Sequence, residues 1–298
     1  MNLAPIALFV YNRPWHTRMT VEALLANAEA AQTPLHIFSD APRNEKVSQL
    51  VSEVRGYIRN ITGFNSITII ERETNLGLAR SIIDGVTRIC DEYGRVIVVE
   101  DDLVTAPFFL AYMNDALTLY EHEERVVSIH GYLYPIKATL PETFFLKGAD
   151  CWGWATWKRG WDIFEAEGKV LLQELTQRNL THHFDFDGAF PYTKMLKNQI
   201  KGKNDSWAIR WYASAYLKDK LTLYPGRSLV LNIGTDSSGT HCSTNNYMTT
   251  NISVTPVKVE LIQVEEDVLA WRLVSKFYKT IRPWLLKRVI RKLISMLR

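Results

Sequence analysis

Cysteine is scarce in this sequence, and no stretch of it stays apolar for long. Its 298 residues include three cysteines, Cys90, Cys151 and Cys242, whose wide spacing fits neither a zinc-ligand pattern nor a disulfide framework. Such cysteine usage is typical of a reducing compartment. No apolar run approaches the ~20 residues that span a bilayer, and the run at residues 3–10 lacks the basic flank of a signal peptide. The sequence therefore predicts a cytoplasmic protein that is not exported.

Acidic residues are absent from the C-terminal end of the sequence. Residues 268–298 contain nine basic side chains and no acidic one. Because the whole chain has 35 basic and 32 acidic residues, the remainder holds 26 basic against 32 acidic and is mildly acidic. This balance argues against a body that binds nucleic acid and directs any anionic partner to the C-terminal end.

Apolar residues make up 47% of the chain, enough for a sizeable core, and their spacing indicates the fold class. Strand-like runs at residues 6–10, 35–39, 66–70 and 95–99 alternate with segments of helical period. The runs are almost continuously apolar, which is typical of parallel strands that are covered on both faces. We therefore predict an α/β fold with a mostly parallel sheet flanked by helices.

Three adjacent carboxylates follow the last of these runs directly. Glu100, Asp101 and Asp102 lie where a parallel sheet binds ligands, beyond the carboxyl end of a strand. Such neighbours repel one another unless a cation or water satisfies them. Mg²⁺ and Mn²⁺ commonly take one or two carboxylates together with substrate phosphates, and they neutralise a departing diphosphate. The alternatives are a solvated loop, or capping of a helix expected from residue 106 with Thr105 as N-cap.

A second acidic group competes for the role of metal site. His182, His183, Asp185 and Asp187 lie within six residues and offer two imidazoles and two carboxylates. No strand precedes them, so they lack the setting of the sheet edge. We interpret this segment as a surface loop.

Four tryptophans cluster at Trp152, Trp154, Trp157 and Trp161. Aromatic rings pack against the apolar faces of sugars, but tryptophan is also an ordinary bulky core residue. We expect both uses here, with Trp152 or Trp154 facing a ligand.

Taken together, several segments resemble the GT-A glycosyltransferases. Among these, the segments are similar to those of bacterial family-two-like enzymes and of the N-acetylglucosaminyltransferase that begins complex N-glycan synthesis. The likeness covers about residues 4–245 and is carried by the order and spacing of five segments: Tyr11-Asn12-Arg13-Pro14, Asn75-Leu76-Gly77, Glu100-Asp101-Asp102, Cys151-Trp152-Gly153-Trp154 and Asp205-Ser206-Trp207.

The resemblance implies a GT-A (Rossmann-like) fold in three parts. Residues 1–125 would form the nucleotide-sugar-binding half. Residues 126–245 would form the acceptor-binding and catalytic half of the same domain, and residues 246–298 a C-terminal extension with a basic amphipathic helix. The implied activity is inverting, metal-dependent transfer from a nucleotide-diphosphate sugar, with a UDP-sugar favoured.

The same resemblance implies roles for individual residues. Tyr11, Arg13 and Asp40 would surround the nucleoside, and Arg80 would lie near the diphosphate. Asp102 would be the direct ligand of Mn²⁺ or Mg²⁺.

Glu100 and Asp101 would contact the ribose or the donor sugar, and Trp152 and Trp154 would complete the nucleotide-sugar site. An acid before the tryptophan of Asp205-Ser206-Trp207 would be the catalytic base. The related enzyme has two consecutive acids there, whereas this chain has serine at 206, so the role falls to Asp205. A base on the face opposite the leaving group is what inversion requires. The alternative for Asp205 is an ordinary turn residue.

The basic C-terminal end has apolar residues at helical spacing between paired cations at residues 284–297. This pattern is typical of helices that lie on anionic membranes, where each cation near the surface contributes ~1 kcal/mol. A helix packed on the domain or on a second subunit is the alternative. A membrane-bound helix would suit a peripheral enzyme on the inner face of the plasma membrane, glycosylating a glycan or lipid-linked acceptor for cell-surface polysaccharide.

Two other function classes compete with this interpretation. A nucleotidyltransferase also uses a metal on an α/β sheet, but it typically opens with a Gly-rich phosphate loop, and here that position holds residues 11–14. A degenerate transferase fold acting as a carbohydrate-binding or membrane scaffold is the second. The intact triplet argues against it, while the serine at 206 favours it.

Overall fold

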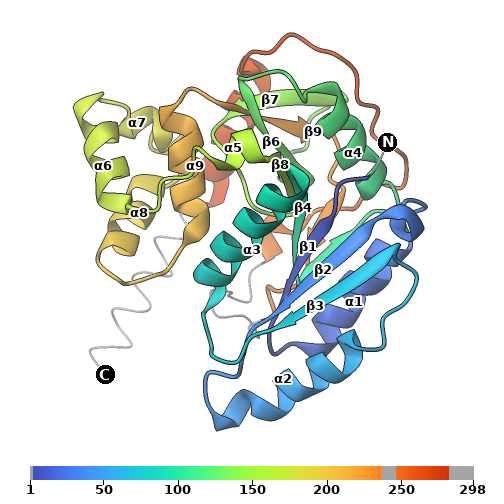
Figure 1. Ribbon diagram of the computed structural model, residues 1–298. Coiled ribbons are helices and arrows are strands. Elements are labelled where there is room, and N and C mark those ends of the chain that lie inside the picture. The colour runs from blue at the N-terminus through green and yellow to red at the C-terminus, as the bar shows by residue number, and fades with distance from the viewer. Residues whose placement is uncertain (1–2, 237–245, 282–298) are drawn as a thin grey trace.

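The computed structural model describes residues 3–236 and 246–281 (Figure 1). They form an eight-stranded sheet of order β3-β2-β1-β4-β8-β6-β9-β7 and a ribbon of β10 and β5. The strands are β1 (Ile6–Val10), β2 (Pro34–Ser39), β3 (Ser66–Glu71), β4 (Arg95–Glu100), β5 (Leu103–Thr105), β6 (Val126–His130), β7 (Thr143–Lys147), β8 (Trp154–Trp157), β9 (Leu221–Pro225) and β10 (Val230–Asn232). The helices are α1 (Pro14–Leu25), α2 (Glu45–Ile58), α3 (Leu78–Tyr93), α4 (Phe109–Leu119), α5 (Lys158–Trp161), α6 (Gly168–Gln177), α7 (Thr181–Phe184), α8 (Tyr192–Ile200) and α9 (Trp207–Leu217).

The predicted α/β class and parallel strands are confirmed. β3, β2, β1 and β4 are all parallel neighbours, and β6 pairs in parallel with β9. β8 runs antiparallel between β4 and β6, so one sheet passes through both predicted halves of the domain. The sheet is therefore mostly parallel and is flanked by helices, as predicted.

The helix predicted from residue 106 begins later. α4 starts at Phe109, and Thr105 ends strand β5 instead of capping the helix. The reason is a strand contact: Thr105 pairs with Val230 of β10, and the Ala106 N–H donates to the Leu229 carbonyl at 2.8 Å. The acidic triplet therefore precedes a strand, and helix capping does not explain it.

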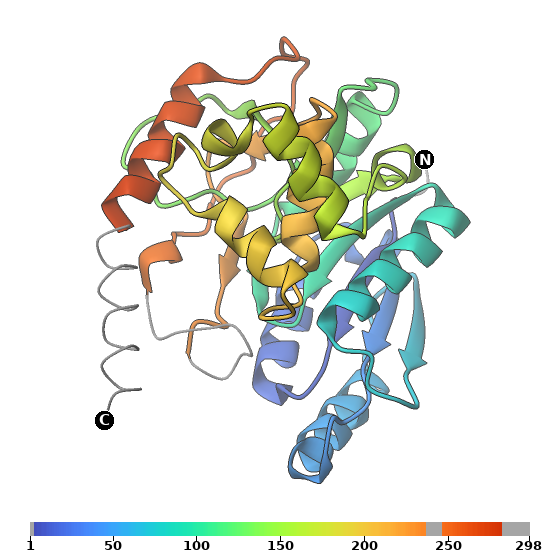
Figure 2. The same cartoon turned by 90° about the vertical axis from the view of Figure 1, so that its left-hand side faces the viewer.

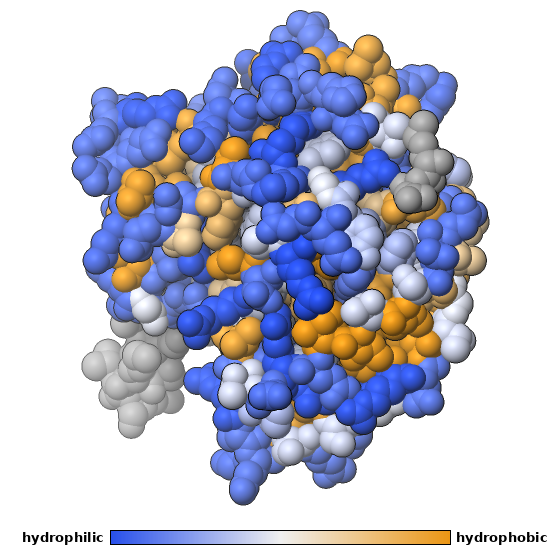
Figure 3. All heavy atoms as spheres, viewed as in Figure 1, coloured by the Kyte–Doolittle hydropathy of each residue, from blue (hydrophilic) through white to orange (hydrophobic). Residues whose placement is uncertain are grey.

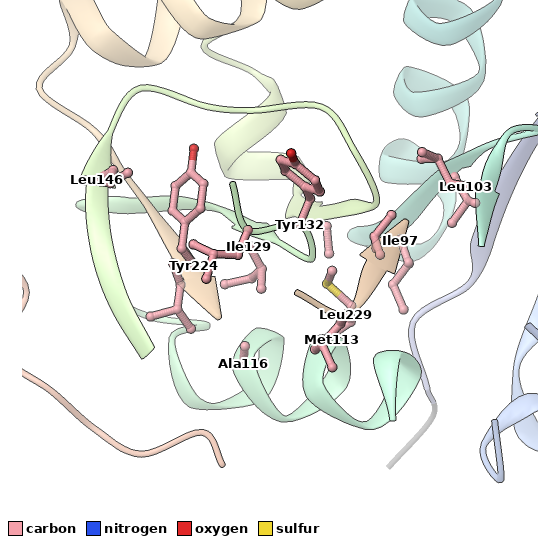
Figure 4. Packing of buried hydrophobic residues seen from close by; sticks show 14 of the residues in the cluster. Ile97, Leu103, Met113, Ala116, Ile129, Tyr132, Leu146, Tyr224 and Leu229 are labelled. Atoms are coloured by element: carbon pink, nitrogen blue, oxygen red, sulfur yellow. The ribbon is translucent and has the colours of Figure 1, made fainter. Parts of the chain in front are cut away.

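Alternation along each strand divides the core into two layers. In β1, Ile6 and Leu8 face the layer that contains α1 and α4, whereas Ala7 and Phe9 face the layer that contains α3 and α9. Figure 4 shows the first layer, in which Met113 of α4 packs close to the sheet. Helices α6–α9 gather at one side of the sheet, on the left in Figure 1.

The edge of the sheet at β3 is only partly covered. β3 is the terminal strand, and its residues are exposed or half-buried. Figure 3 shows an apolar patch where β2 and β3 lie in Figure 1. The loops that follow β2 and β3 form one side of the candidate site described below. The patch itself is apolar.

The C-terminal extension packs against the body before the chain reaches its basic end. Residues 268–281 are helical and stand beside the α6–α9 group in Figure 2. The Lys147 N–H donates to Glu266 at 2.9 Å, and the hydroxyls of Tyr278 and Tyr192 lie 2.8 Å apart. The amphipathic helix predicted at residues 284–297 lies outside the described residues.

Within the described part of the chain, each helix is too short or too polar to cross a bilayer.

Candidate active site

The loops that follow β1 and β4 meet at the carboxyl edge of the sheet. The Tyr11 N–H donates to an Asp101 carboxylate oxygen at 3.3 Å. One guanidinium nitrogen of Arg13, Nη2, lies 2.5 Å from Asp101 and 2.9 Å from Asp102. Because parallel strands present their carboxyl ends at one edge, segments about 90 residues apart in sequence are brought together here. Arg13 and the triplet thus form one charge cluster.

Burial sets the electrostatics of this cluster. Burial, reinforced by Asp102 and Asp101, raises the pKa of Glu100 to about 8. Burial also raises the pKa of Asp101 to about 6, although Arg13 opposes that shift. Burial works against the charge of Arg13, but the two aspartates outweigh it and raise the pKa of Arg13 above its ordinary value. One arginine therefore faces two buried acids, with the half-buried Glu100 beside them, and the cluster favours a further positive charge.

The cluster has one unused hydrogen-bond donor for an anionic ligand. Nη1 of Arg13 is buried and has no hydrogen-bond partner among the described residues. Such an orphaned donor is costly, and a ligand is one way to satisfy it. A Cβ added at Gly234 would lie 2.1 Å from Asp102 Oδ2 and 2.9 Å from Arg13 Nη1. Only glycine therefore fits where the chain passes Asp102.

The acidic residues fit a hard divalent cation of the kind that also binds phosphate. Within residues 3–236 and 246–281, no group of three or more His, Cys, Asp or Glu side chains could hold a metal by itself. A metal held by one or two carboxylates and substrate phosphates needs no such group. Asp102 and Glu100 are the oxygen donors available for that arrangement.

Asp40 lies at the same edge, after β2, with its carboxylate already well bonded. It accepts hydrogen bonds from the Leu76 N–H at 2.9 Å and the Gly77 N–H at 2.8 Å. It also accepts from the Asn75 amide at 3.0 Å and from the Ala41 N–H. Asp40 thus holds the loop that leads into α3, and its contact with a nucleoside stays a prediction.

Tyr11 and Arg80 flank this loop. The Tyr11 hydroxyl accepts a hydrogen bond from the Arg43 N–H at 2.9 Å, which ties the loop after β1 to the loop after β2. Arg80 is exposed in the first turn of α3. Both residues are positioned at the edge where the charge cluster lies, and their roles toward a ligand stay predictions.

A cavity of about 500 Å³ opens beside the triplet. Glu100 lies at one part of its lining, and Trp152 and Asp205 line it as well. Aromatic rings form a large share of its wall; they include Tyr132, Tyr134, Trp152, Tyr192, Tyr212 and Tyr278. Concave, largely apolar sites with a few polar groups are where small ligands bind. The cavity therefore joins the acidic cluster to an aromatic chamber.

Trp152 fits the predicted ligand-facing role, and Trp154 does not. Trp152 is half-buried in the cavity wall, with its ring against Tyr132 at 4.7 Å between centroids. Trp154, on β8, has 0% of its surface exposed and stacks on Trp207 at 5.5 Å. Strand alternation turns its side chain into the core between β8 and α9. We therefore remove Trp154 from the ligand-contacting residues.

Asp205 and Ser206 have different tasks at the start of α9. Ser206 is the N-cap: its hydroxyl accepts a hydrogen bond from the Ile209 N–H at 3.2 Å. Asp205 lines the cavity with 66% of its side chain exposed and lies 3.5 Å from Arg210. The serine that replaces the expected second acid thus stabilises the helix, and Asp205 is the carboxylate available at this rim.

The side chains of the competing acidic group at residues 182–187 make hydrogen bonds and an ion pair within the fold. Asp185 accepts a hydrogen bond from the Thr193 N–H at 2.6 Å, and His183 Nδ1 lies 2.7 Å from the Tyr216 hydroxyl. His182 lies 3.3 Å from Asp187 on the surface. Only His182 and Asp187 of the four contact each other, and His183 and Asp185 are bonded to other parts of the fold. The predicted surface loop is in part the short helix α7.

Sequence reasoning missed Asp150, a carboxylate in the cavity wall. It accepts a hydrogen bond from the Tyr134 hydroxyl at 2.5 Å and from the Cys151 N–H at 2.9 Å. The residue directly precedes the Cys151–Trp154 segment, and that position was the available signal. Its importance depends on tyrosines from distant segments, which periodicity does not place.

His130 accepts a hydrogen bond from the backbone of Trp152, and its buried ring predicts a pH dependence of stability. Its Nε2 accepts a hydrogen bond from the Trp152 N–H at 3.2 Å. Burial lowers the pKa of His130 below 6.5, although Asp150 opposes the shift. The folded protein therefore keeps this histidine neutral, while the unfolded chain binds a proton below about pH 6.5. Its contribution to stability is present above that pH and is lost as the pH falls.

We expect His130→Gln, which cannot titrate, to flatten this dependence. Over the pH range below 6.5 in which only the unfolded chain binds the proton, the free energy of unfolding of the wild type should fall by about 1.4 kcal/mol more per pH unit than that of the variant. Urea unfolding between pH 5 and 8 measures the difference, and exposed His122→Gln is the matched control. Parallel profiles of wild type and His130→Gln would contradict a neutral, buried His130.

No protein-family model matches this sequence, and no curated protein matches it. Solved structures do match. S. aureus TarS matches 78% of this chain and 37% of its own, with 12% identity and a TM-score of 0.42. TarS 1-349 in complex with UDP-GlcNAc matches 76% and 57%, with 10% identity and a TM-score of 0.40. The mannosyltransferase PcManGT from Pyrobaculum calidifontis, in complex with GDP-Man and Mn²⁺, matches 46% and 36%, with 11% identity and a TM-score of 0.31.

This chain thus spans well under two thirds of each of these proteins. Two of these structures contain a nucleotide sugar. At such identities and TM-scores, activity has to be argued from the residues of the site. Fold and site together define an α/β protein with an acidic sheet edge that opens into an aromatic cavity. The finer likeness to the N-acetylglucosaminyltransferase stays a prediction.

Proposed function

We propose that this protein is a metal-dependent, inverting glycosyltransferase. It moves a sugar from a nucleotide-diphosphate donor, with a UDP-sugar favoured, to a glycan or lipid-linked acceptor. One observation carries the proposal: Nη1 of Arg13, in the charge cluster close to Gly234, is buried and has no hydrogen-bond partner among the described residues. A phosphate oxygen satisfies that donor, and the adjoining carboxylates suit the cation that accompanies a diphosphate.

In this proposal the chain's own residues divide the work. Asp102, with Glu100 beside it, holds Mn²⁺ or Mg²⁺, which supplies positive charge to the departing diphosphate. Arg13 donates to a phosphate oxygen, and Arg80 adds positive charge nearby. Asp205 accepts the proton of the acceptor hydroxyl while that oxygen bonds to the anomeric carbon and the bond to the diphosphate breaks. The aromatic cavity wall keeps water from competing with the acceptor.

Hydrolysis of the donor without acceptor tests the proposal. The purified protein is incubated with UDP-, GDP- and dTDP-sugars, with Mn²⁺ or with EDTA, and released nucleotide is measured. We expect slow release from one nucleotide class that stops in EDTA, because water replaces the acceptor at the same site. Absence of release from every donor, together with absence of binding, would favour the carbohydrate-binding scaffold.

We also propose that residues 282–298 bind an anionic membrane, which would place the enzyme on the cytoplasmic leaflet in cell-surface polysaccharide synthesis. The support is the sequence: basic and apolar residues alternate there at helical spacing. Residues 268–281 pack on the body and contribute Tyr278 to the cavity, so a shortened chain should end at residue 281.

The measurement is flotation with liposomes of phosphatidylcholine and phosphatidylglycerol. The full chain should float and the 1–281 chain should stay in the dense fraction, with the same melting temperature as the full chain. High salt should reduce flotation, because surface charges are screened. Equal flotation of both proteins would overturn the membrane role of residues 282–298.

A further inference from the structure

The aromatic cavity is built from parts of the chain that lie far apart in sequence. Tyr134 lies in the loop between β6 and β7, and Trp152 in the loop between β7 and β8. Asp205 directly precedes α9, and Tyr278 belongs to the C-terminal helical segment. In Figure 4 the rings of Tyr132 and Tyr224 stand on the sheet, with their hydroxyl ends turned away from α4. The cavity thus has a floor of aromatic rings and an array of hydroxyl groups.

Asp150 is a hydrogen-bond acceptor among these hydroxyls. It accepts from the Tyr134 hydroxyl, and the Tyr134 ring lies edge-on to that of Tyr278 at 5.3 Å between centroids. The Tyr278 hydroxyl lies in turn 2.8 Å from that of Tyr192. The two bonds that Asp150 receives come from a hydroxyl and from a backbone N–H. A carboxylate has about four lone-pair positions, so Asp150 can still accept hydrogen bonds from a ligand.

Asp150 shares its cavity with the first acid of the triplet. Glu100, Asp150 and Cys151, the residue after Asp150, all line that cavity. The aromatic chamber therefore adjoins the charge cluster at Glu100. A ligand in the chamber lies next to whatever binds at the triplet.

The charges of the cavity select against an anionic ligand. Among its described lining residues, the carboxylates are Glu100, Asp150 and Asp205. The one cationic side chain in that lining is Lys147, whose ammonium lies 2.5 Å from Asp219 outside the cavity. A carboxylate or phosphate on the ligand would be repelled by the carboxylate of Asp150 in the chamber wall, whereas neutral hydroxyls can donate to it.

We propose that the aromatic chamber is the acceptor subsite and takes an uncharged sugar residue, whose hydroxyls donate to Asp150 while its ring packs against the aromatic wall. Only the identification of the bound sugar as the acceptor rests on the proposed function. The binding of a neutral sugar to this chamber can be tested independently of it. Asp150 is a specificity-determining residue here, and Tyr134 is a positioning residue that holds the carboxylate in place.

Saturation-transfer NMR with small sugars tests the binding chemistry directly. The probes are methyl gluco-, galacto- and mannopyranoside and the three matching methyl hexuronides, at neutral pH and without donor. We expect at least one neutral glycoside to bind and its hexuronide to bind at least tenfold more weakly. Asp150→Asn should weaken the neutral ligand about tenfold, because a hydrogen bond to a charged acceptor is lost.

Variants separate this role from a loss of folding. Tyr134→Phe keeps the ring and should weaken binding less than Asp150→Asn, and exposed Asp162→Asn is the matched control. Acceptor-free hydrolysis of the donor should be unchanged in Asp162→Asn, and the near-UV circular dichroism of Asp150→Asn should match that of the wild type, which would show that its fold is intact. If the wild type binds sugars in this pattern but does not hydrolyse a donor, the proposed function fails and the subsite stands. Equal binding of neutral and acidic sugars, unchanged binding by Asp150→Asn, or no binding of any probe would overturn the inference.

Discussion

Asp102→Asn is expected to lower metal-dependent release of nucleotide from the donor by more than about 100-fold. Removing a group that only supports a metal ligand typically costs 10- to 100-fold, and Asp102 is the proposed direct ligand. Asparagine keeps the shape of the side chain and an oxygen that can accept from Arg13, now 2.9 Å away. The loss should therefore be one of metal-dependent chemistry, measured as initial rates over a range of Mn²⁺ concentrations.

Asp187→Asn is the matched control for this substitution. Asp187 belongs to the competing acidic group, with 45% of its side chain exposed, and its backbone adopts a φ of 52° that asparagine tolerates well. It should keep the wild-type rate and metal dependence. If instead Asp187→Asn loses activity and Asp102→Asn retains it, the metal lies at the other cluster.

Arg13→Met is expected to lower the free energy of unfolding by about 3 kcal/mol in EDTA. The side chain of Arg13 is 15% exposed and those of its two aspartate partners are 7% and 11% exposed, so its removal leaves buried carboxylates without their counter-charge. Breaking a buried ion pair from one side costs about 3–5 kcal/mol. Urea unfolding, monitored by the fluorescence of the buried tryptophans, measures the change.

A divalent metal should restore part of the unfolding free energy that Arg13→Met loses. If the carboxylates form a cation site, Mn²⁺ supplies some of the missing positive charge, and the stability difference between Arg13→Met and wild type shrinks when Mn²⁺ replaces EDTA. Exposed Arg43→Met in the neighbouring loop should match the wild type in both conditions. A deficit of the same size with and without Mn²⁺ would mean that Arg13 serves the fold alone.

The sheet edge could be predicted because its signals are local. The run at residues 95–99 is apolar throughout, as buried parallel strands are, and the acids follow it without a break. Topology then brings the ends of β1, β2 and β4 to the same edge, which is why Arg13, Asp40 and the triplet were expected together. The structure agrees on their positions.

The aromatic chamber could not be predicted in the same way. Asp150, Tyr134, Tyr192 and Tyr278 meet only through tertiary contacts between the loops around β7, helix α8 and the C-terminal segment. Trp154 was misjudged for a related reason, since an aromatic cluster in sequence does not say which ring the strand turns inward. Thr105 was predicted to cap a helix because the sequence does not show that it pairs with Val230 of β10.

The central claim is that the acidic edge binds a nucleotide-diphosphate sugar together with a divalent metal. Its most direct test is the melting temperature of the wild-type protein against a panel of UDP-, GDP-, dTDP- and CMP-sugars, each with Mn²⁺ and with EDTA. A ligand that binds only the folded protein raises the melting temperature by mass action. We predict a rise with one nucleotide class that requires Mn²⁺ and is lost in Asp102→Asn. No rise with any donor, or a rise that persists in EDTA and in Asp102→Asn, would contradict the claim.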